Sequence, residues 1–196
     1  MVRFSPASAP TDTRPPPLSP GCQHHRVRVV AGTAKGRKLT APPGRDVRPT
    51  SDRVREAVFS SLVSMDAVEG ASVLDLFAGS GALGIEALSR GAATATFVDD
   101  DPQAVATVEA NLVATGLDGG TVVRADALRW LESAPRLDLA LVDPPYEFAA
   151  WDQLLGRLRA GVLVAESDHE LDLGAGWGVV RIKRYGGTVV TLAARE

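Results

Sequence analysis

A glycine-rich turn between an apolar segment and a helical pattern constrains this chain more than any other feature. Residues 73–88 read Val-Leu-Asp-Leu-Phe-Ala-Gly-Ser-Gly-Ala-Leu-Gly-Ile-Glu-Ala-Leu, in which the glycines have G-x-G-x-x-G spacing. Asp99 lies twenty residues after Gly79, at the end of a second apolar segment, 95–98. In parallel α/β folds this arrangement places a nucleotide across a helix N-terminus, with the acid on the ribose hydroxyls.

The glycine spacing alone is a weak signal, because dinucleotide-binding folds share it, and Asp75 favours a different ligand. Its carboxylate comes four residues before Gly79, where it would repel a pyrophosphate and attract an ammonium group. S-adenosylmethionine carries an ammonium and a sulfonium but no phosphate, so it is the ligand that these residues favour. A nicotinamide-dependent oxidoreductase is the alternative from another enzyme class.

A second motif, Asp143-Pro144-Pro145-Tyr146, follows the apolar segment 137–142. Prolines cannot continue a strand, so the chain leaves the sheet here, at the strand end where open α/β sheets bind ligands. The carboxylate, the proline-flanked carbonyls and the aromatic ring suit a planar base with an exocyclic amino group. On its own, the motif also fits a proline-rich strand-to-helix turn.

Strand and helix patterns alternate through the rest of the chain, which predicts an α/β fold with a mostly parallel sheet covered on both faces. Only Tyr185-Gly186-Gly187 separates the last two strands, so these should form an antiparallel C-terminal hairpin. The expected helices are 82–90, 102–115, 127–133 and 151–159. The seven expected strands are 72–78, 94–99, 121–125, 138–143, 161–166, 177–184 and 188–194.

The first 66 residues divide into a tail and a basic extension. Residues 1–25 are rich in Pro, Ser, Ala and Thr without periodicity, which predicts a disordered tail. Residues 26–39 predict a small hairpin that Pro42-Pro43-Gly44 closes. Thr50 or Ser51 can then cap a helix whose apolar face is formed by Val54, Val58, Leu62 and Met65.

The net charge of −3 conceals a strong asymmetry. Residues 26–55 contain nine Lys or Arg and two Asp, a net +7, whereas residues 56–196 carry −11. A segment of this kind suits nucleic-acid phosphates, and the alternative is a solvated basic face docked on the acidic domain. The cations that we assign to RNA contacts are Arg28, Lys35, Arg37, Lys38, Arg48, Arg53 and Arg55.

Composition bounds the remaining possibilities. A chain of 196 residues with 45% hydrophobic residues fits one globular domain, and no apolar run is long enough to span a membrane. The single cysteine, Cys22, excludes an internal disulfide and fits a reducing compartment. Cys22, His24 and His25 lack a fourth ligand, so we expect no metal. We expect a cytoplasmic monomer without a membrane partner.

Together the motifs resemble those of class I S-adenosylmethionine-dependent amino-methyltransferases, on residues 75–81 and 143–146. Four further stretches, 36–39, 48–56, 81–91 and 185–188, make the chain similar to bacterial 16S rRNA guanine-N2 methyltransferases of the RsmD type. The resemblance covers roughly residues 26–194, except for a divergent stretch at 147–176. It implies a Rossmann-like methyltransferase domain at 67–196, with a seven-stranded sheet, and an RNA-binding extension at 26–66.

The resemblance also implies a donor site for S-adenosylmethionine. Asp99 would bind the ribose hydroxyls, and Asp126, which follows the strand 121–124, would receive the adenine amino group. A helix N-cap is a second role for Asp126, compatible with the first. The methionine end of the donor would be held by Asp75, Phe77, Ala78, Gly79, Ser80 and Gly81.

For the acceptor, the resemblance implies a guanine in 16S rRNA, either as free RNA or within a partly assembled small ribosomal subunit. Asp143 and the carbonyl of Pro144 would accept hydrogen bonds from the N2 amine, and Tyr146 would stack on the base. Adenine N6 or cytosine N4 of RNA or DNA is the alternative acceptor, because the motif recognises an amine rather than one base. A non-catalytic RNA-binding module is a further alternative.

Overall fold

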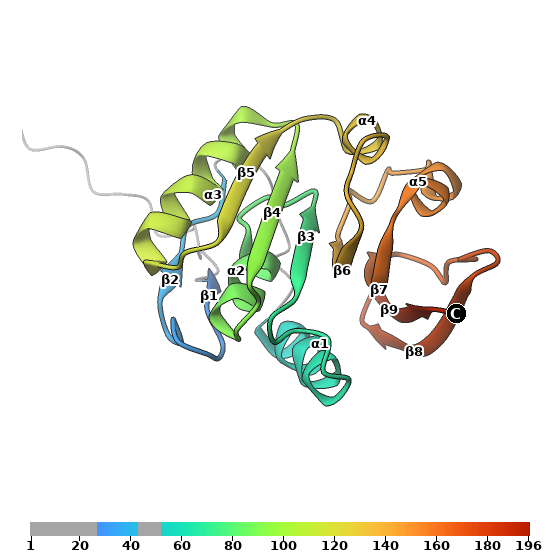
Figure 1. Ribbon diagram of the computed structural model, residues 1–196, viewed down its shortest axis with the longest axis horizontal. Coiled ribbons are helices and arrows are strands. Elements are labelled where there is room, and N and C mark those ends of the chain that lie inside the picture. The colour runs from blue at the N-terminus through green and yellow to red at the C-terminus, as the bar shows by residue number, and fades with distance from the viewer. Residues whose placement is uncertain (1–26, 43–51) are drawn as a thin grey trace, which may run out of the picture.

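A seven-stranded sheet forms the centre of the molecule in the computed structural model, which describes residues 27–42 and 52–196 (Figure 1). The strand order is β5-β4-β3-β6-β7-β9-β8. The strands are β3 (Ser72–Leu76), β4 (Thr94–Asp99), β5 (Gly120–Arg124), β6 (Leu137–Val142), β7 (Ala160–Ser167), β8 (Trp177–Tyr185) and β9 (Thr188–Arg195).

The strands β5, β4, β3, β6 and β7 are parallel to one another, and β9 pairs antiparallel with both β7 and β8. This arrangement confirms the predicted mostly parallel sheet and its C-terminal hairpin. The strand predicted at 72–78 ends earlier, at Leu76, because Phe77 adopts a left-handed backbone conformation with φ of 63°. The chain therefore turns out of the sheet directly before the glycines.

In the described parts of the chain, five helices cover the two faces of the sheet (Figure 1). One face carries α1 (Asp52–Ser64), α2 (Ala82–Ser89) and α3 (Pro102–Thr115), which share a core with Val73, Phe97 and Leu141. The other face carries α4 (Ala127–Leu131) and α5 (Trp151–Arg157), which pack on Leu76 and Val142. None of the helices in the described parts of the chain is long and apolar enough to cross a membrane.

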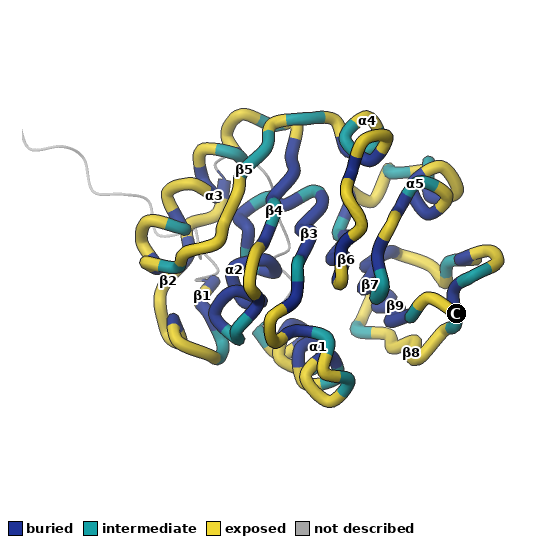
Figure 2. Tube along the Cα trace, in the orientation of Figure 1, coloured by how far each residue is buried: buried dark blue, intermediate teal, exposed yellow. Residues whose placement is uncertain are grey.

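The basic extension packs against the same core as α2. Its hairpin consists of β1 (Val27–Arg28) and β2 (Lys38–Leu39), paired antiparallel as predicted. Val27, Val29 and Leu39 are buried in one core with the apolar face of α1. Figure 2 shows dark blue, buried segments of this hairpin among yellow, exposed ones. Gly44, Thr50, Ser51 and the tail 1–25 lie outside the described residues.

Candidate active site

The two sequence motifs meet because β3 and β6 are neighbours in the sheet. Leu76, the last residue of β3, is in register with Val142, the last residue of β6. The Asp143 N–H donates to the Leu76 carbonyl at 3.4 Å, across the point where both chains leave the sheet. Two segments almost seventy residues apart therefore leave the same edge together, at the carboxyl ends of parallel strands.

The glycine turn is compact and has an unusual backbone. Phe77, Gly79 and Gly81 all have positive φ, at 63°, 55° and 73°. The Gly81 N–H donates to the Ala78 carbonyl at 2.7 Å, and α2 begins at Ala82 with no side-chain cap. Glycine adopts this conformation without a Cβ penalty, whereas Phe77 is strained in it, and such strain clusters at binding sites.

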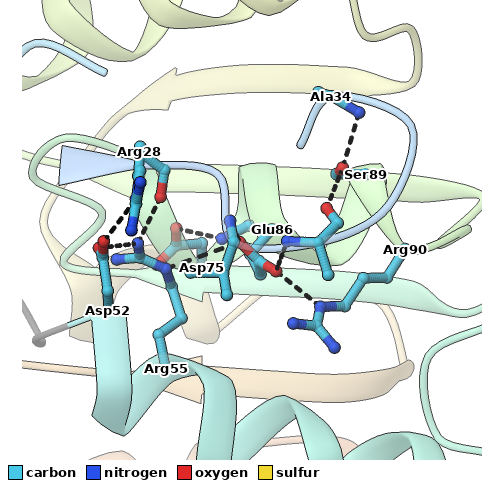
Figure 3. A network of polar contacts seen from close by, with 11 residues as sticks. Arg28, Ala34, Asp52, Arg55, Asp75, Glu86, Ser89 and Arg90 are labelled. Carbon is cyan, nitrogen blue, oxygen red and sulfur yellow. Dashed lines mark hydrogen bonds and ion pairs between the residues drawn. The ribbon is translucent and has the colours of Figure 1, made fainter. Parts of the chain in front are cut away.

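Asp75 lies beneath this turn and is only 2% exposed. Its carboxylate accepts from the Gly84 N–H at 2.8 Å (Figure 3 shows the residue). The pKa of Asp75 is raised to about 8, mainly by burial and to a smaller extent by the negative charges of Asp143 and Asp99, while the Gly84 hydrogen bond opposes the shift. A cationic ligand group beside this carboxyl would offset the cost of its burial, so the site fits an ammonium group.

The third glycine of the motif serves helix packing. A Cβ on Gly84 would lie 2.4 Å from Cε1 of Phe97 and 3.1 Å from Cβ of Asp75. The absence of a side chain therefore allows α2 to lie directly on β3 and β4, and this keeps the start of the helix close to the turn.

Asp99 is buried at the end of β4 and faces the glycine turn. One carboxylate oxygen accepts from the Gly79 N–H at 2.9 Å, and the other from the Asp101 N–H at 3.0 Å. The next two acids have other positions, because Asp100 is exposed and Asp101 caps α3 by accepting from the Gln103 N–H. Asp99 is thus the acid of this run that holds the turn.

Asp126 is exposed and follows β5, at the same edge of the sheet as the glycine turn. Its side chain accepts from the Arg129 N–H at 2.9 Å, which confirms the predicted helix cap. A contact with adenine stays a prediction for this residue.

The Asp-Pro-Pro-Tyr motif presents one polar and one aromatic side chain at the edge of the sheet. Asp143 is half-buried and Pro144 is buried, whereas the Tyr146 side chain is 55% exposed. The Tyr146 hydroxyl lies 3.5 Å from Oγ1 of Thr188, the first residue of β9, which directly follows the turn from β8. Phe148 packs edge-on against Phe77, with 5.1 Å between ring centroids, and so joins the two motifs.

The family described as "Conserved hypothetical protein 95" matches residues 27–194. The chain belongs to this family. Ribosomal RNA small subunit methyltransferase D of Escherichia coli (strain K12) is 34% identical, over 87% of this chain and 91% of the length of the relative. YlbH of Bacillus subtilis is 39% identical over 85% of this chain and 97% of its own. The predicted RsmD-type methyltransferase is confirmed.

Solved structures agree with this assignment. The yhhF protein from Escherichia coli superposes with a TM-score of 0.78 at 34% identity, and covers 87% of this chain and 98% of its own. SMU.776, solved in complex with SAH, shares the fold with a TM-score of 0.62 at 18% identity, over 73% of this chain and 48% of its own. The Rossmann-like fold predicted from the sequence is thereby confirmed.

Most of the predicted RNA-binding cations of this RsmD-type methyltransferase face solvent. Arg28 forms an exposed ion pair with Asp52 at 3.0 Å. The Arg37 guanidinium donates to the Ala114 carbonyl at 3.1 Å. Arg48 lies outside the described residues. The exposed members of the set are Arg28, Lys35, Arg37, Lys38 and Arg53.

The predicted role of Arg55 needs correction, because its side chain is completely buried. Its Nη2 donates to the Arg28 carbonyl at 2.5 Å and to Oδ1 of Asp52 at 2.8 Å. A guanidinium enclosed in this way cannot reach RNA, so the prediction that Arg55 contacts RNA is wrong. The sequence contains a sign of this burial, because Arg55 lies four and seven residues before the apolar residues Phe59 and Leu62 and so shares their face of the helix.

The extension docks on α2 through its backbone (Figure 3). Glu86 accepts from the Val30 N–H at 2.7 Å and from the Ala31 N–H at 3.0 Å. The Ser89 hydroxyl accepts from the Ala34 N–H at 2.9 Å and donates to the Ala31 carbonyl. The backbone of the basic segment is therefore docked on the acidic domain while five of its cations are exposed, and contact of these cations with nucleic acid stays a prediction.

A buried amide connects the extension to the glycine turn. The Asn111 side chain, in α3, donates to the carbonyls of Thr40 and Ser80 at 2.9 and 2.8 Å, and accepts from the Thr40 N–H. The sequence predicts no role for Asn111 or Glu86, because Asn111 lies outside the motifs and the backbone partners of Glu86 are more than fifty residues away in the chain. Within residues 27–42 and 52–196, no three His, Cys, Asp or Glu side chains are grouped to hold a metal.

Proposed function

We propose that this protein transfers a methyl group from S-adenosylmethionine to the N2 amine of a guanine in 16S rRNA. The observation that carries the proposal is the placement of Asp143-Pro144-Pro145-Tyr146 beside the glycine turn, through the pairing of β3 with β6. Family membership favours methyl transfer over hydride transfer. The small-subunit rRNA substrate rests on the name of the Escherichia coli relative.

The donor site would use the residues around the glycine turn. Asp75 would receive the ammonium group, because its burial favours a cationic partner. Asp99 would accept from the ribose hydroxyls with the remaining lone pairs of its carboxylate, while it still holds Gly79. Asp126 would accept from the adenine amine. The SAH bound to SMU.776, which shares the fold, supports a donor of this chemical class.

The chemistry follows from the electronics of an exocyclic amine. Its lone pair is delocalised into the ring, so the nitrogen is a poor nucleophile in its planar form. The Asp143 carboxylate and the Pro144 carbonyl would accept from its two hydrogens and so favour a pyramidal nitrogen, whose lone pair is free to attack. When bound, S-adenosylmethionine supplies an electrophilic methyl group on a sulfonium.

After transfer, the nitrogen is cationic and acidic enough to release a proton to solvent without a strongly basic side chain. Most of the acceleration would then come from positioned acceptors and from the orientation of the base. The target base must leave its stack to enter the site, and the exposed Tyr146 ring would receive it. Base–aromatic stacking contributes roughly 1–3 kcal/mol.

The exposed cations of the extension would bind RNA phosphates around the target, within a partly assembled small subunit. Because the extension docks on α2 and is joined by Asn111 to the glycine turn, RNA held there would be aligned with the donor site. A monomer in the cytoplasm stays a prediction.

The decisive experiment is methyl transfer by the purified protein to 16S rRNA, as free RNA and as a partly assembled small subunit. The product nucleosides are then identified by mass spectrometry. We expect N2-methylguanosine. A methylated adenine or cytosine would overturn the guanine assignment and favour the alternative acceptors, and hydride transfer with a nicotinamide substrate would overturn the reaction class.

A further inference from the structure

A second group of cations lies on β8, far in sequence from the basic extension. Arg181, Lys183 and Arg184 fall within four residues and all are exposed. They belong to the part of the chain, 56–196, that carries a net charge of −11. A concentration of positive charge on one strand of an acidic domain is therefore a local feature that the overall composition does not explain.

The strand alternation separates these cations into two faces. Arg181, Lys183 and Tyr185 pair with Leu192, Val190 and Thr188 of β9, and point to the side of the sheet that carries α1. Arg184 is at an intervening position and lies 3.6 Å from Glu170. Two of the three cations thus share a face with an aromatic ring.

This face and α1 enclose a groove, which we call the α1–β8 groove. One hollow is lined by Ser61 of α1 together with Arg181, Lys183 and Tyr185, and by five apolar residues of α1, β7 and β9. A second hollow shares Ser61 and Arg181 and continues along α1 past Ser60 and Ser64. No Asp or Glu is among the described residues that line either hollow.

The chemistry of the groove matches a phosphodiester backbone. The Arg181 guanidinium donates to the Ser61 hydroxyl at 3.2 Å across the groove, and the Lys183 ammonium lies 5.2 Å from the centre of the Tyr185 ring. Arginine, lysine and serine are residues that commonly contact phosphate oxygens. The Ser61 and Ser64 hydroxyls donate within α1, to the carbonyls of Ala57 and Ser60. What the groove offers an anionic chain is therefore the positive charge of Arg181 and Lys183, with no acid among its lining residues to repel that chain.

The groove also leads to the acceptor motif. Tyr185 is paired with Thr188 across the tight turn between β8 and β9. The Thr188 Oγ1 lies 3.5 Å from the hydroxyl of Tyr146, the residue proposed to stack on the target base. A strand that leaves the target base at Tyr146 thus meets the turn first, and then Lys183 and Arg181.

We propose that the α1–β8 groove binds the single-stranded RNA next to the target nucleotide, with Arg181 and Lys183 on its phosphates. This inference rests on the proposed function. It adds a second RNA-contacting surface, whose cations lie near the C-terminal end of the chain, to the exposed cations of the basic extension. The two surfaces would hold RNA on either side of the flipped base.

An edge strand often carries charged side chains for another reason, since charge prevents pairing with the edge of a second molecule. β8 is the last strand of the sheet, so this explanation applies equally to Arg181, Lys183 and Arg184. The two explanations differ for Arg184, which is on the same edge and outside the groove. Arg184→Gln is therefore the matched control.

The test compares the double variant Arg181→Gln/Lys183→Gln with Arg184→Gln in binding to transcribed 16S rRNA between 50 and 200 mM salt. Single-stranded contacts contribute about 0.7 each to the slope of log K against log salt. We expect the double variant to lower the slope by about 1.4 and the affinity at 0.1 M salt by roughly 10- to 30-fold. Arg184→Gln should retain both.

Two further arms separate the proposal from structural effects. Donor binding by calorimetry should be unchanged in the double variant, and the charge-conserving Arg181→Lys/Lys183→Arg should restore the slope. An unchanged slope in the double variant, or an equal loss in Arg184→Gln, would overturn the groove as an RNA site. A loss seen only with assembled particles and not with free rRNA would indicate a protein partner, which also overturns it.

The outcome is independent of the product assay. If the wild-type protein binds rRNA with a slope that depends on Arg181 and Lys183 but produces no N2-methylguanosine, the groove stands and the proposed reaction fails. If methylation is observed and the slope is insensitive to both residues, the reaction stands and the groove fails.

Discussion

The Glu86 carboxylate and the Arg55 guanidinium form an ion pair closed to solvent, with 3.7 Å between Oε2 and Nε and no exposed side-chain surface. The same carboxylate accepts from Arg90 Nε at 2.6 Å and from two backbone N–H groups of the extension. One acidic residue of α2 therefore holds α1 and the extension against the helix that begins at the glycine turn.

Glu86→Ala should destabilise the protein strongly, because it leaves a buried guanidinium and two backbone donors without this acceptor. Breaking one side of a buried ion pair costs about 3–5 kcal/mol of unfolding free energy. Urea denaturation measures the effect, with Glu109→Ala, at an exposed position of α3, as the control expected within about 0.5 kcal/mol of wild type. Equal stabilities of the two variants would contradict the structural role of Glu86.

Asp75 should make the protein less stable as the pH rises from about 4 to about 8. Its pKa is raised by burial from 3.8 to about 8, so the folded state keeps a proton that the unfolded chain has lost. In that window, each rise of one pH unit therefore lowers the unfolding free energy by up to about 1.4 kcal/mol. Above about pH 8, Asp75 causes no further decrease. Asp75→Asn should flatten the profile in urea denaturation at pH 5 to 9, and identical profiles would refute the assignment.

Donor binding should release a proton if an ammonium group lies beside Asp75. Below pH 8 the carboxyl is protonated, and a cationic partner favours its ionised form. The affinity for S-adenosylmethionine should therefore rise with pH and level off near pH 8. Calorimetry at pH 6.5 in buffers of different ionisation enthalpy should detect up to one proton released, and Asp75→Asn should release fewer. No difference between buffers would exclude the ammonium contact.

Asp99→Ala should weaken binding of S-adenosylmethionine by roughly 1.5–3 kcal/mol, because charge-assisted hydrogen bonds to the ribose would be lost. Part of the loss should arise from Gly79, which Asp99 also holds in place. Asp100→Ala is the matched control, since Asp100 is the adjacent exposed acid. Calorimetric affinities of both folded variants provide the comparison, and equal affinities would remove Asp99 from the donor site.

Asp143→Ala should lower the rate of methyl transfer more than the binding of either substrate. The lost acceptor matters most as the amine becomes pyramidal, and one such group is worth about 10²–10³ in rate. Tyr146→Ala should weaken capture of the base instead, whereas Tyr146→Phe should be mild because stacking needs only the ring. Single-turnover transfer to 16S rRNA separates these effects, and a near-normal rate for Asp143→Ala would refute its role.

The local patterns of the chain predicted most of the fold. The seven strands of the sheet and the helices α2 to α5 are within two residues of their expected bounds, because apolar periodicity and glycine or proline positions act over short distances. The largest error at a strand end, at Phe77, came from a positive φ that a phenylalanine rarely adopts. The helix cap at Asp126 was predicted for the same local reason.

The other errors and omissions involve contacts between distant segments. Arg55 belongs to a strongly basic run, and the charge count alone made it an RNA contact. Its burial depends on Glu86, thirty-one residues later, and on the Arg28 backbone. The groove cations Arg181 and Lys183 were missed because the acidic average of residues 56–196 concealed them.

The sequence by itself determined the glycine turn, the rigid exit of the chain at Asp143 and the alternation that produces a parallel sheet. These depend on backbone preferences of a few adjacent residues. Only the tertiary structure decided that β3 lies beside β6, that Glu86 encloses Arg55, and that Arg181 and Lys183 face α1. Such relationships arise from packing between segments that are far apart in the chain, and the burial or exposure of a charge is set by that packing rather than by its neighbours in sequence.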